Sequence, residues 1–162
     1  MQNTRPLLLE SDFPSIQRGQ LETLQVNLGY LCNLSCVHCH VNAGPTRTEL
    51  MDWETMAGVL ELAARSGART LDLTGGAPEL NPHFRELVRA AREQGLHVID
   101  RCNLTVLLEP GQETLAGFLA VQEVEITASM PCYLEENVEQ QRGKGVYADS
   151  IEALRGLKEL GY

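Results

Sequence analysis

The feature that most constrains the fold is a repeated alternation of short strand-like runs with helical patterns. Four aliphatic runs each lead into a loop and then into a helix. They span residues 24–28, 70–74, 97–101 and 123–128. Because strands that alternate with helices pair in parallel, we predict an α/β domain built from successive βα units.

The helices between these runs have legible ends. Asp52 is placed to cap a helix that Gly67 ends, and its apolar residues recur at i, i+3, i+4 and i+7. Asn81 followed by Pro82 marks the start of a second helix, which ends at Gly95. Two further helices are predicted over residues 112–120 and 150–160.

Polar residues alternate with apolar ones within the predicted strands. Gln25 and Asn27 alternate with leucine and valine in the first run, and Asp72 and Thr74 do the same in the second. Because side chains point alternately to the two faces of a strand, one face of the sheet is apolar and the other polar. This pattern predicts a partial (βα) barrel around a wet cavity, with functional residues at the carboxyl ends of the strands.

Composition narrows the class of protein. The chain has 162 residues, enough for one domain, and a net charge of −9, which disfavours binding to a phosphate backbone. It contains neither a run of about 20 apolar residues nor a signal peptide, so we expect no membrane association and a cytoplasmic location. Its cysteine count of five is odd, which in a reducing compartment points to metal binding or reactive thiols.

Three of these cysteines lie in one loop directly after the first strand. Cys32, Cys36 and Cys39 have the spacing C-x3-C-x2-C. A [4Fe–4S] cluster usually has four thiolate ligands, so three would leave one iron open to another ligand. The alternative is a zinc site completed by His38 or His40, although all its ligands would then come from a single short loop.

A glycine pair follows the second strand. Gly75 and Gly76 would let a ligand approach the backbone closely, and Glu79 is available to a cation. A turn with no ligand is the alternative, because paired glycines often occur at strand ends.

With Asn103 after the third strand and Ser129 after the fourth, these motifs resemble the radical S-adenosylmethionine (SAM) superfamily. The resemblance implies a (βα)6 partial barrel, of which this chain carries four units. It implies a [4Fe–4S] cluster on the three loop cysteines, whose open iron binds the amino and carboxylate groups of SAM, and reductive cleavage to a 5′-deoxyadenosyl radical. It also implies a small-molecule substrate and a reducing partner such as flavodoxin or ferredoxin.

The resemblance assigns further residues to the SAM pocket. Gly75 and Gly76 receive the SAM amino group, Asn103 and Ser129 line the pocket, and His38 takes the place of an aromatic residue near the adenine. Two more residues are candidates for cofactor binding. Glu79 falls two positions later than the family's usual glutamate, and Arg101 pairs either with the SAM carboxylate or near Asp100.

Several strings resemble, more narrowly, the arsenosugar-biosynthesis radical SAM proteins. They begin at Gln25, Cys39, Arg101 and Gln141. This resemblance implies transfer of the deoxyadenosyl group to a dimethylated arsenic(III) species. The alternatives are hydrogen abstraction from a peptide or another metabolite, and a non-catalytic iron–sulfur or zinc module.

Two cysteines outside the loop are candidate substrate ligands. Cys102 and Cys132 follow strand ends and could bind arsenic(III) as thiolates; otherwise they are small buried hydrophobic residues.

The predicted domain organisation is an irregular leader over residues 1–20 and a radical SAM core over 21–162. The βα rhythm stops before a fifth strand, so we expect a truncated core that self-associates or has reduced stability. The charged segment 135–145 is predicted to be a solvated loop.

Overall fold

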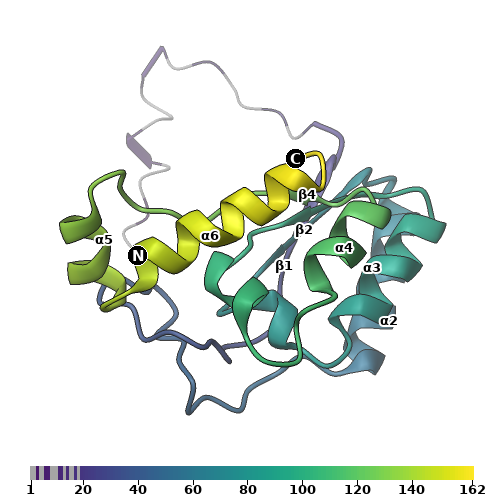
Figure 1. The fold of residues 1–162 in the computed structure, drawn as a ribbon. Coiled ribbons are helices and arrows are strands. Elements are labelled where there is room, and N and C mark those ends of the chain that lie inside the picture. Colours follow the sequence, from purple (N-terminus) through teal and green to yellow (C-terminus); the bar gives the residue numbers. More distant parts are fainter. Residues whose placement is uncertain (1–2, 4–5, 8–10, 13, 15–16, 18) are drawn as a thin grey trace.

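The computed structural model describes residues 3, 6–7, 11–12, 14, 17 and 19–162, so most of the expected leader lies outside the described residues. Four strands form one parallel sheet in the order β1-β2-β3-β4 (Figure 1). They are β1 (Thr23–Asn27), β2 (Thr70–Thr74), β3 (His97–Asp100) and β4 (Glu125–Ile126). The parallel βα architecture expected from the sequence is therefore confirmed.

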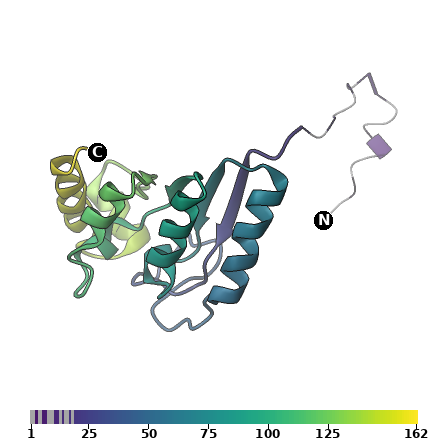
Figure 2. The ribbon, with the colours of Figure 1, turned by 90° about the vertical axis from the view of Figure 1, so that its right-hand side faces the viewer.

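Helices connect the strands and cover the sheet. The α-helices are α2 (Trp53–Ser66), α3 (Phe84–Glu93), α4 (Leu115–Val121), α5 (Glu135–Arg142) and α6 (Val146–Glu159). Two 3-10 turns, η1 (Pro78–Leu80) and η2 (Leu104–Leu108), follow β2 and β3. In Figure 1, α2, α3 and α4 lie on one side of the sheet, and α6 packs against η2. Figure 2, turned by 90°, shows α2 beside β1 and the α6 region at the opposite end of the domain.

The core lies between the sheet and these helices. Leu71, Leu73 and Val98 of the central strands are fully buried, as are Met56 of α2 and Phe84 of α3. The apolar positions of the strands thus face the helices, as the alternation predicts, and the polar positions remain for the opposite face.

Two elements differ from the sequence expectation at their ends. Asn81 does not cap α3, which begins three residues later. Its amide nitrogen instead donates to the carbonyl oxygens of Leu28 and Met51, both at 2.9 Å, and its side-chain oxygen accepts from the N–H of His83. Asn81 therefore ties the end of β1 to η1, and this tertiary contact outweighs the local capping signal. β4 has two paired residues, fewer than expected.

The prediction of a solvated loop over 135–145 is wrong, because most of this segment is helix α5. The reason is tertiary packing: Val138 is fully buried, and the carbonyl of Gln141 accepts from the N–H of Val37 at 2.9 Å. One apolar residue among charged ones gives no helical stripe, so sequence pattern alone favours a loop. Helix α6 also starts at Val146 rather than near residue 150.

The cap of α2 gives a first testable prediction. The N–H of Thr55 donates to the Asp52 carboxylate at 2.9 Å, and Asp52 has the extended backbone of an N-cap residue. Asp52→Ala should therefore lower the free energy of unfolding by about 1 kcal/mol. Urea denaturation measures this, with Glu54→Ala in the first turn of the same helix as the control; equal midpoints for Asp52→Ala and the parent chain would contradict it.

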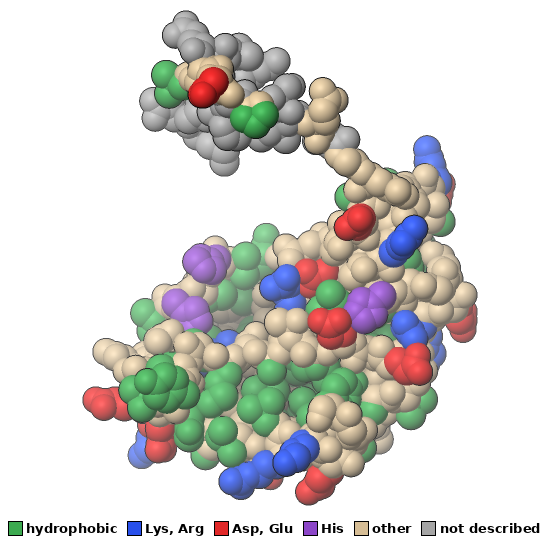
Figure 3. Space-filling view, turned by 90° about the horizontal axis from the view of Figure 1, so that it is seen from above, with side chains coloured by type: hydrophobic (Ala, Val, Ile, Leu, Met, Phe, Trp, Pro, Cys, Tyr) green, Lys and Arg blue, Asp and Glu red, His purple; other side chains and the backbone are tan. Residues whose placement is uncertain are grey.

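Part of the surface is apolar. Figure 3 shows hydrophobic side chains gathered on the face seen from above, bordered by charged ones. Leu108 and Leu160 are both about two-fifths exposed or more, and they border a hollow of about 480 Å³ between η2, α4 and α6. Within the described part of the chain, none of the helices has the length and apolar character that crossing a bilayer requires.

Candidate functional site

A cavity of about 280 Å³ opens where the first three strands end. It brings together residues that lie far apart in the sequence. Of those predicted to bind a cofactor or metal, it is lined by Cys32, Cys36, His38, Cys39, Gly75, Gly76, Arg101, Asn103 and Ser129. His40, Thr74 and Arg142 also line it.

The cysteine loop is held by its own backbone. The N–H of Cys32 donates to the carbonyl of Gly44 at 3.2 Å, and the N–H of Gly44 donates to the carbonyl of Tyr30 at 3.1 Å. The Cys39 sulfur accepts from the N–H of Ala43 at 3.2 Å. Residues 30–44 therefore form a closed loop that presents its three thiols to one side, with Cys32 buried and the other two cysteines half-buried.

The glycine pair has a different physical reason from the one expected. Gly75 has φ +142°, and a Cβ there would lie 2.6 Å from the carbonyl oxygen of Gly29. A Cβ on Gly76 would overlap the carbonyl oxygen of Leu31. The N–H groups of Gly76 and Ala77 donate to these two carbonyls, both at 2.9 Å. The end of β2 is thus packed directly against the backbone of the cysteine loop, and only glycine fits.

Asn103 connects the third strand to the same loop. Its side-chain nitrogen donates to the Cys32 sulfur at 3.5 Å and to the Asn33 side-chain oxygen at 2.6 Å. Thr105 donates to the Asn103 side-chain oxygen at 3.3 Å. A hydrogen bond to a ligating sulfur orients that ligand and tunes the reduction potential of a bound cluster.

The electrostatics of the thiols favour binding to a cation. Burial raises the pKa of Cys32, and the neighbouring charges of Cys36, Glu79 and Cys39 raise it further against a lowering hydrogen bond from the Leu34 backbone. Burial also raises the pKa of Cys36, which the Arg142 guanidinium partly offsets. Three thiolates in this place need positive charge beside them, which iron supplies. The residues present therefore fit an iron–sulfur cluster.

Their spacing also bears on the zinc alternative. Within the described residues, one group of three His, Cys, Asp or Glu ligand atoms lies within 4.8 Å of one another, and it is Glu79, Asp100 and Cys102. The loop thiols form no such group. A four-iron cluster holds its thiolates further apart than a single ion does, because each binds a different iron. The arrangement therefore favours a cluster over zinc at this loop.

Arg142 is the lining residue that sequence reasoning missed. It ends α5, and its Nε and Nη1 atoms are buried without a hydrogen-bond partner. Unpaired buried guanidinium donors are costly, so they indicate an anionic ligand. The sequence places Arg142 just before Gly143, within a string noted only for family resemblance, and gives no sign that it faces the cysteine loop.

Arg101 pairs with neither of its expected partners. Its guanidinium makes hydrogen bonds of 2.8, 2.8 and 3.2 Å to the Asp72 carboxylate, which also accepts from Gln25 at 2.9 Å. Burial raises the pKa of Asp72, but these hydrogen bonds and the Arg101 charge outweigh it, so the pKa lies below its ordinary value. Arg101 therefore neutralises a buried carboxylate on the polar face of the sheet.

Arg101→Ala should destabilise the domain by about 1–2 kcal/mol near neutral pH, since it leaves Asp72 buried without its cation. The pKa of Asp72 is lowered in the folded state, so its stabilising contribution is present above the unfolded value of 3.8 and is lost as pH falls through the folded value. Urea unfolding at neutral and at strongly acidic pH tests this. A deficit of the same size at both would contradict it.

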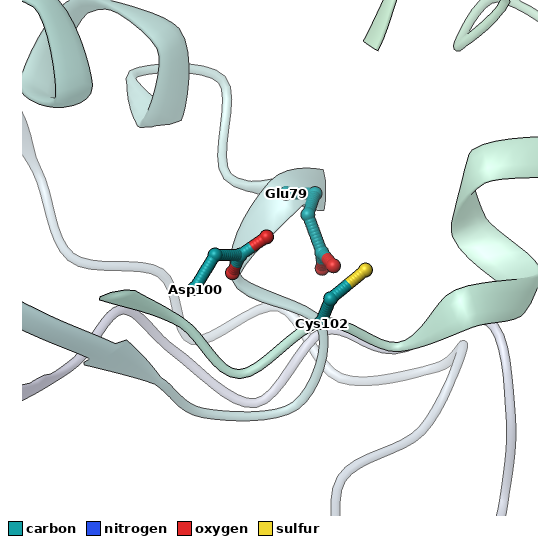
Figure 4. Close-up of side chains that lie close together, drawn as sticks. All are labelled: Glu79, Asp100 and Cys102. Atoms are coloured by element: carbon teal, nitrogen blue, oxygen red, sulfur yellow. The ribbon is translucent and has the colours of Figure 1, made fainter. Parts of the chain in front are cut away.

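Three predicted site residues lie outside the cavity. Glu79 is buried in η1, where it accepts from the N–H of Asn103 at 3.0 Å, so the structure does not place it toward a cofactor. Cys102 has no exposed surface and points toward Glu79 and Asp100 (Figure 4). Cys132 is half-buried near α5, and hydrogen bonds from the N–H of Leu134 and from Asn137 lower its pKa.

Comparison with known proteins agrees with this geometry. The family model described as "Radical SAM superfamily" matches residues 26–162. The chain belongs to the radical SAM superfamily. Members of this superfamily bind SAM at a [4Fe–4S] cluster.

The curated relatives of this radical SAM chain have other names than the arsenosugar family. A "Probable GTP 3',8-cyclase" of Saccharolobus solfataricus is 32% identical over 142 residues, which cover 87% of this chain and 45% of that protein. "Mycofactocin maturase MftC" of Mycobacterium ulcerans is 28% identical over 135 residues, covering 83% and 36%. The chain spans less than half the length of these relatives. They support the superfamily but not the narrower resemblance.

Solved structures show the same fold. Streptococcus suis SuiB bound to S-adenosylmethionine has a TM-score of 0.69 at 16% identity, covering 88% of this chain and 32% of SuiB. The anSMEcpe structure with bound AdoMet also has a TM-score of 0.69, at 20% identity, covering 86% and 41%. The partial βα barrel is therefore the shared element.

Proposed function

We propose that this chain binds a [4Fe–4S] cluster through Cys32, Cys36 and Cys39, and SAM in the adjoining cavity, and that it cleaves SAM reductively. One observation carries the proposal: three thiols, the glycine pair and an unpaired buried arginine line a single cavity at the strand ends. A non-catalytic iron–sulfur module would need the thiols but would not need the rest of this lining.

The residues divide the work. When bound, the cluster supplies the electron that breaks the sulfonium carbon–sulfur bond of SAM. Cys32 is oriented by Asn103, and Gly76 keeps the end of β2 against the cysteine loop. Arg142 is placed to bind the SAM carboxylate through its free donors, because guanidinium pairs with carboxylate in a bidentate manner. His38 lies along the same lining, in reach of the nucleoside part.

For the substrate, we propose a dimethylated arsenic(III) species that accepts the deoxyadenosyl group. The support is the sequence resemblance, and Cys132 is the free thiol that remains accessible to a soft arsenic centre. Cys102 is too deeply buried for this role. Hydrogen abstraction from a peptide or a nucleotide is the second candidate, which the names of the cyclase and maturase relatives favour.

A one-electron donor such as flavodoxin or ferredoxin is the proposed reducing partner. The cysteine loop reaches the surface beside the cluster position, where Val37 is 86% exposed. An exposed apolar residue next to a redox centre suits a transient protein contact.

Product analysis tests the function. The anaerobically reconstituted chain, reduced with dithionite, should convert SAM to methionine and a deoxyadenosyl product, and Cys36→Ala should not. With dimethylarsinous acid present, the product should carry arsenic when separated chromatographically and detected by mass spectrometry. Plain 5′-deoxyadenosine formed only with a peptide or nucleotide would favour hydrogen abstraction. Iron and sulfide content without any SAM turnover would overturn the catalytic proposal.

A further inference from the structure

A second group of potential ligands lies outside the cavity. Glu79 of η1, Asp100 at the end of β3 and Cys102 have ligand atoms that all lie within 4.8 Å of one another. Figure 4 shows the two carboxylates and the thiol pointing toward a common centre. Arg101 and Asn103 line the cavity, so the alternating residues Asp100 and Cys102 face the opposite side of the chain, toward the core.

The carboxylates of this group lack partners. Asp100 has no exposed surface and Glu79 is 4% exposed. Both oxygens of Asp100 and Oε2 of Glu79 accept no hydrogen bond, and no ion pair among the described residues includes either side chain. Two unpaired carboxylates in a protein core are too costly to persist as bare charges. Protons or a cation must neutralise them.

Protonation alone leaves the group poorly satisfied. Two carboxylic acids would each add an O–H that needs an acceptor, and the structure has no hydrogen bond between Glu79 and Asp100. Burial raises the pKa of Glu79 to about 7 against the lowering effect of the Cys102 thiol. Burial and the charge of Glu79 also raise the pKa values of Asp100 and Cys102 well above their ordinary ranges. A cation that enters the group would therefore displace protons.

We propose that Glu79, Asp100 and Cys102 form a second metal site, for a structural divalent transition ion such as Zn²⁺ or Fe²⁺. Two carboxylate oxygens and one thiolate suit these ions, whereas Ca²⁺ and Mg²⁺ require oxygen ligands alone. Tetrahedral coordination at about 2.0–2.3 Å places neighbouring ligand atoms roughly 3.3–3.8 Å apart. Small side-chain rotations would close the observed group to that spacing.

The site would support the wall behind the cysteine loop. Glu79 accepts from the backbone of Asn103, whose side chain donates to Cys32. An ion that joins η1 to the end of β3 would fix this connection, while remaining separate from the cluster and from SAM. This inference does not rest on the proposed function.

Metal analysis of a cluster-free chain tests the site. The full chain with Cys32→Ser, Cys36→Ser and Cys39→Ser is loaded anaerobically with Zn²⁺, Fe²⁺ or Co²⁺ and then desalted. We expect about one ion per chain, and with Co²⁺ a thiolate-to-metal charge-transfer band. Adding Cys102→Ser or Asp100→Asn should reduce the bound metal at least tenfold and abolish the band. Loading with Zn²⁺ and Fe²⁺ together shows which ion the site retains.

Two matched controls accompany these variants. Cys132→Ser removes another thiol outside the loop, and Asp72→Asn alters a buried carboxylate that already has partners; both should retain the ion. If the cluster-free chain does not fold, the reconstituted parent chain serves instead, with one ion expected beyond the cluster iron. Unchanged metal content in Cys102→Ser would overturn the site. So would a metal-free chain whose infrared spectrum at neutral pH shows a protonated carboxyl band that Asp100→Asn removes.

Discussion

Gly76→Ala is expected to abolish cluster uptake and to destabilise the domain by about 3 kcal/mol. The new Cβ would overlap the carbonyl oxygen of Leu31, and it would lie 3.0 Å from the Cβ of Ala43. The overlapping atom is backbone and cannot rotate away, so the segment before Cys32 must move. That movement would also break the hydrogen bonds from Gly76 and Ala77 to the cysteine loop. Iron and sulfide analysis after anaerobic reconstitution measures the first effect, and urea denaturation the second.

The matched control is Gly58→Ala in α2, where an added Cβ meets no atom within 4 Å. This change should leave cluster content unaltered and slightly stabilise the helix, because alanine restricts the unfolded chain more than glycine does. Normal cluster content and an unchanged midpoint in Gly76→Ala would show that the two backbones are not packed as the structure has them.

The sequence predicted the parallel sheet and the cysteine loop because both depend on local signals. Strand alternation reports which side chains face the core, and the C-x3-C-x2-C spacing lies within eight residues. The glycine pair was also found from sequence, but for an incomplete reason. Its close neighbours, Gly29 and Leu31, are brought against it only by the pairing of β1 with β2.

The positions that sequence reasoning misplaced depend on tertiary contacts. Asn81 has the residue type of a helix cap, yet it binds the backbone of Leu28 and Met51. Glu79 was expected to face a cofactor, but the 3-10 turn after β2 directs it into the core beside Asp100. Arg101 lies opposite a carboxylate of the neighbouring strand, a pairing that requires the register of β2 with β3.

Arg142→Gln is expected to weaken SAM binding by about 10–100-fold while leaving cluster content unchanged. The Arg142 side chain lines the cavity, and two of its nitrogen atoms are buried without acceptors. A charge-assisted hydrogen bond to a carboxylate contributes about 1.5–3 kcal/mol, which corresponds to this loss of affinity. Isothermal titration of SAM into the anaerobic, cluster-loaded chain measures it. Arg142→Lys should recover part of the affinity, because it restores the charge but not the planar pair of donors.

Lys144→Gln provides the comparison, since it removes a positive charge two residues away from an exposed position. If long-range charge alone attracted SAM, both variants would weaken binding to a similar degree, and added salt would reduce the difference from the parent chain. If direct contact matters, Arg142→Gln alone loses affinity, and a SAM analogue without the carboxylate binds the parent chain and Arg142→Gln equally. Full affinity for SAM in Arg142→Gln would exclude this arginine from the SAM site and leave its buried donors to another anion.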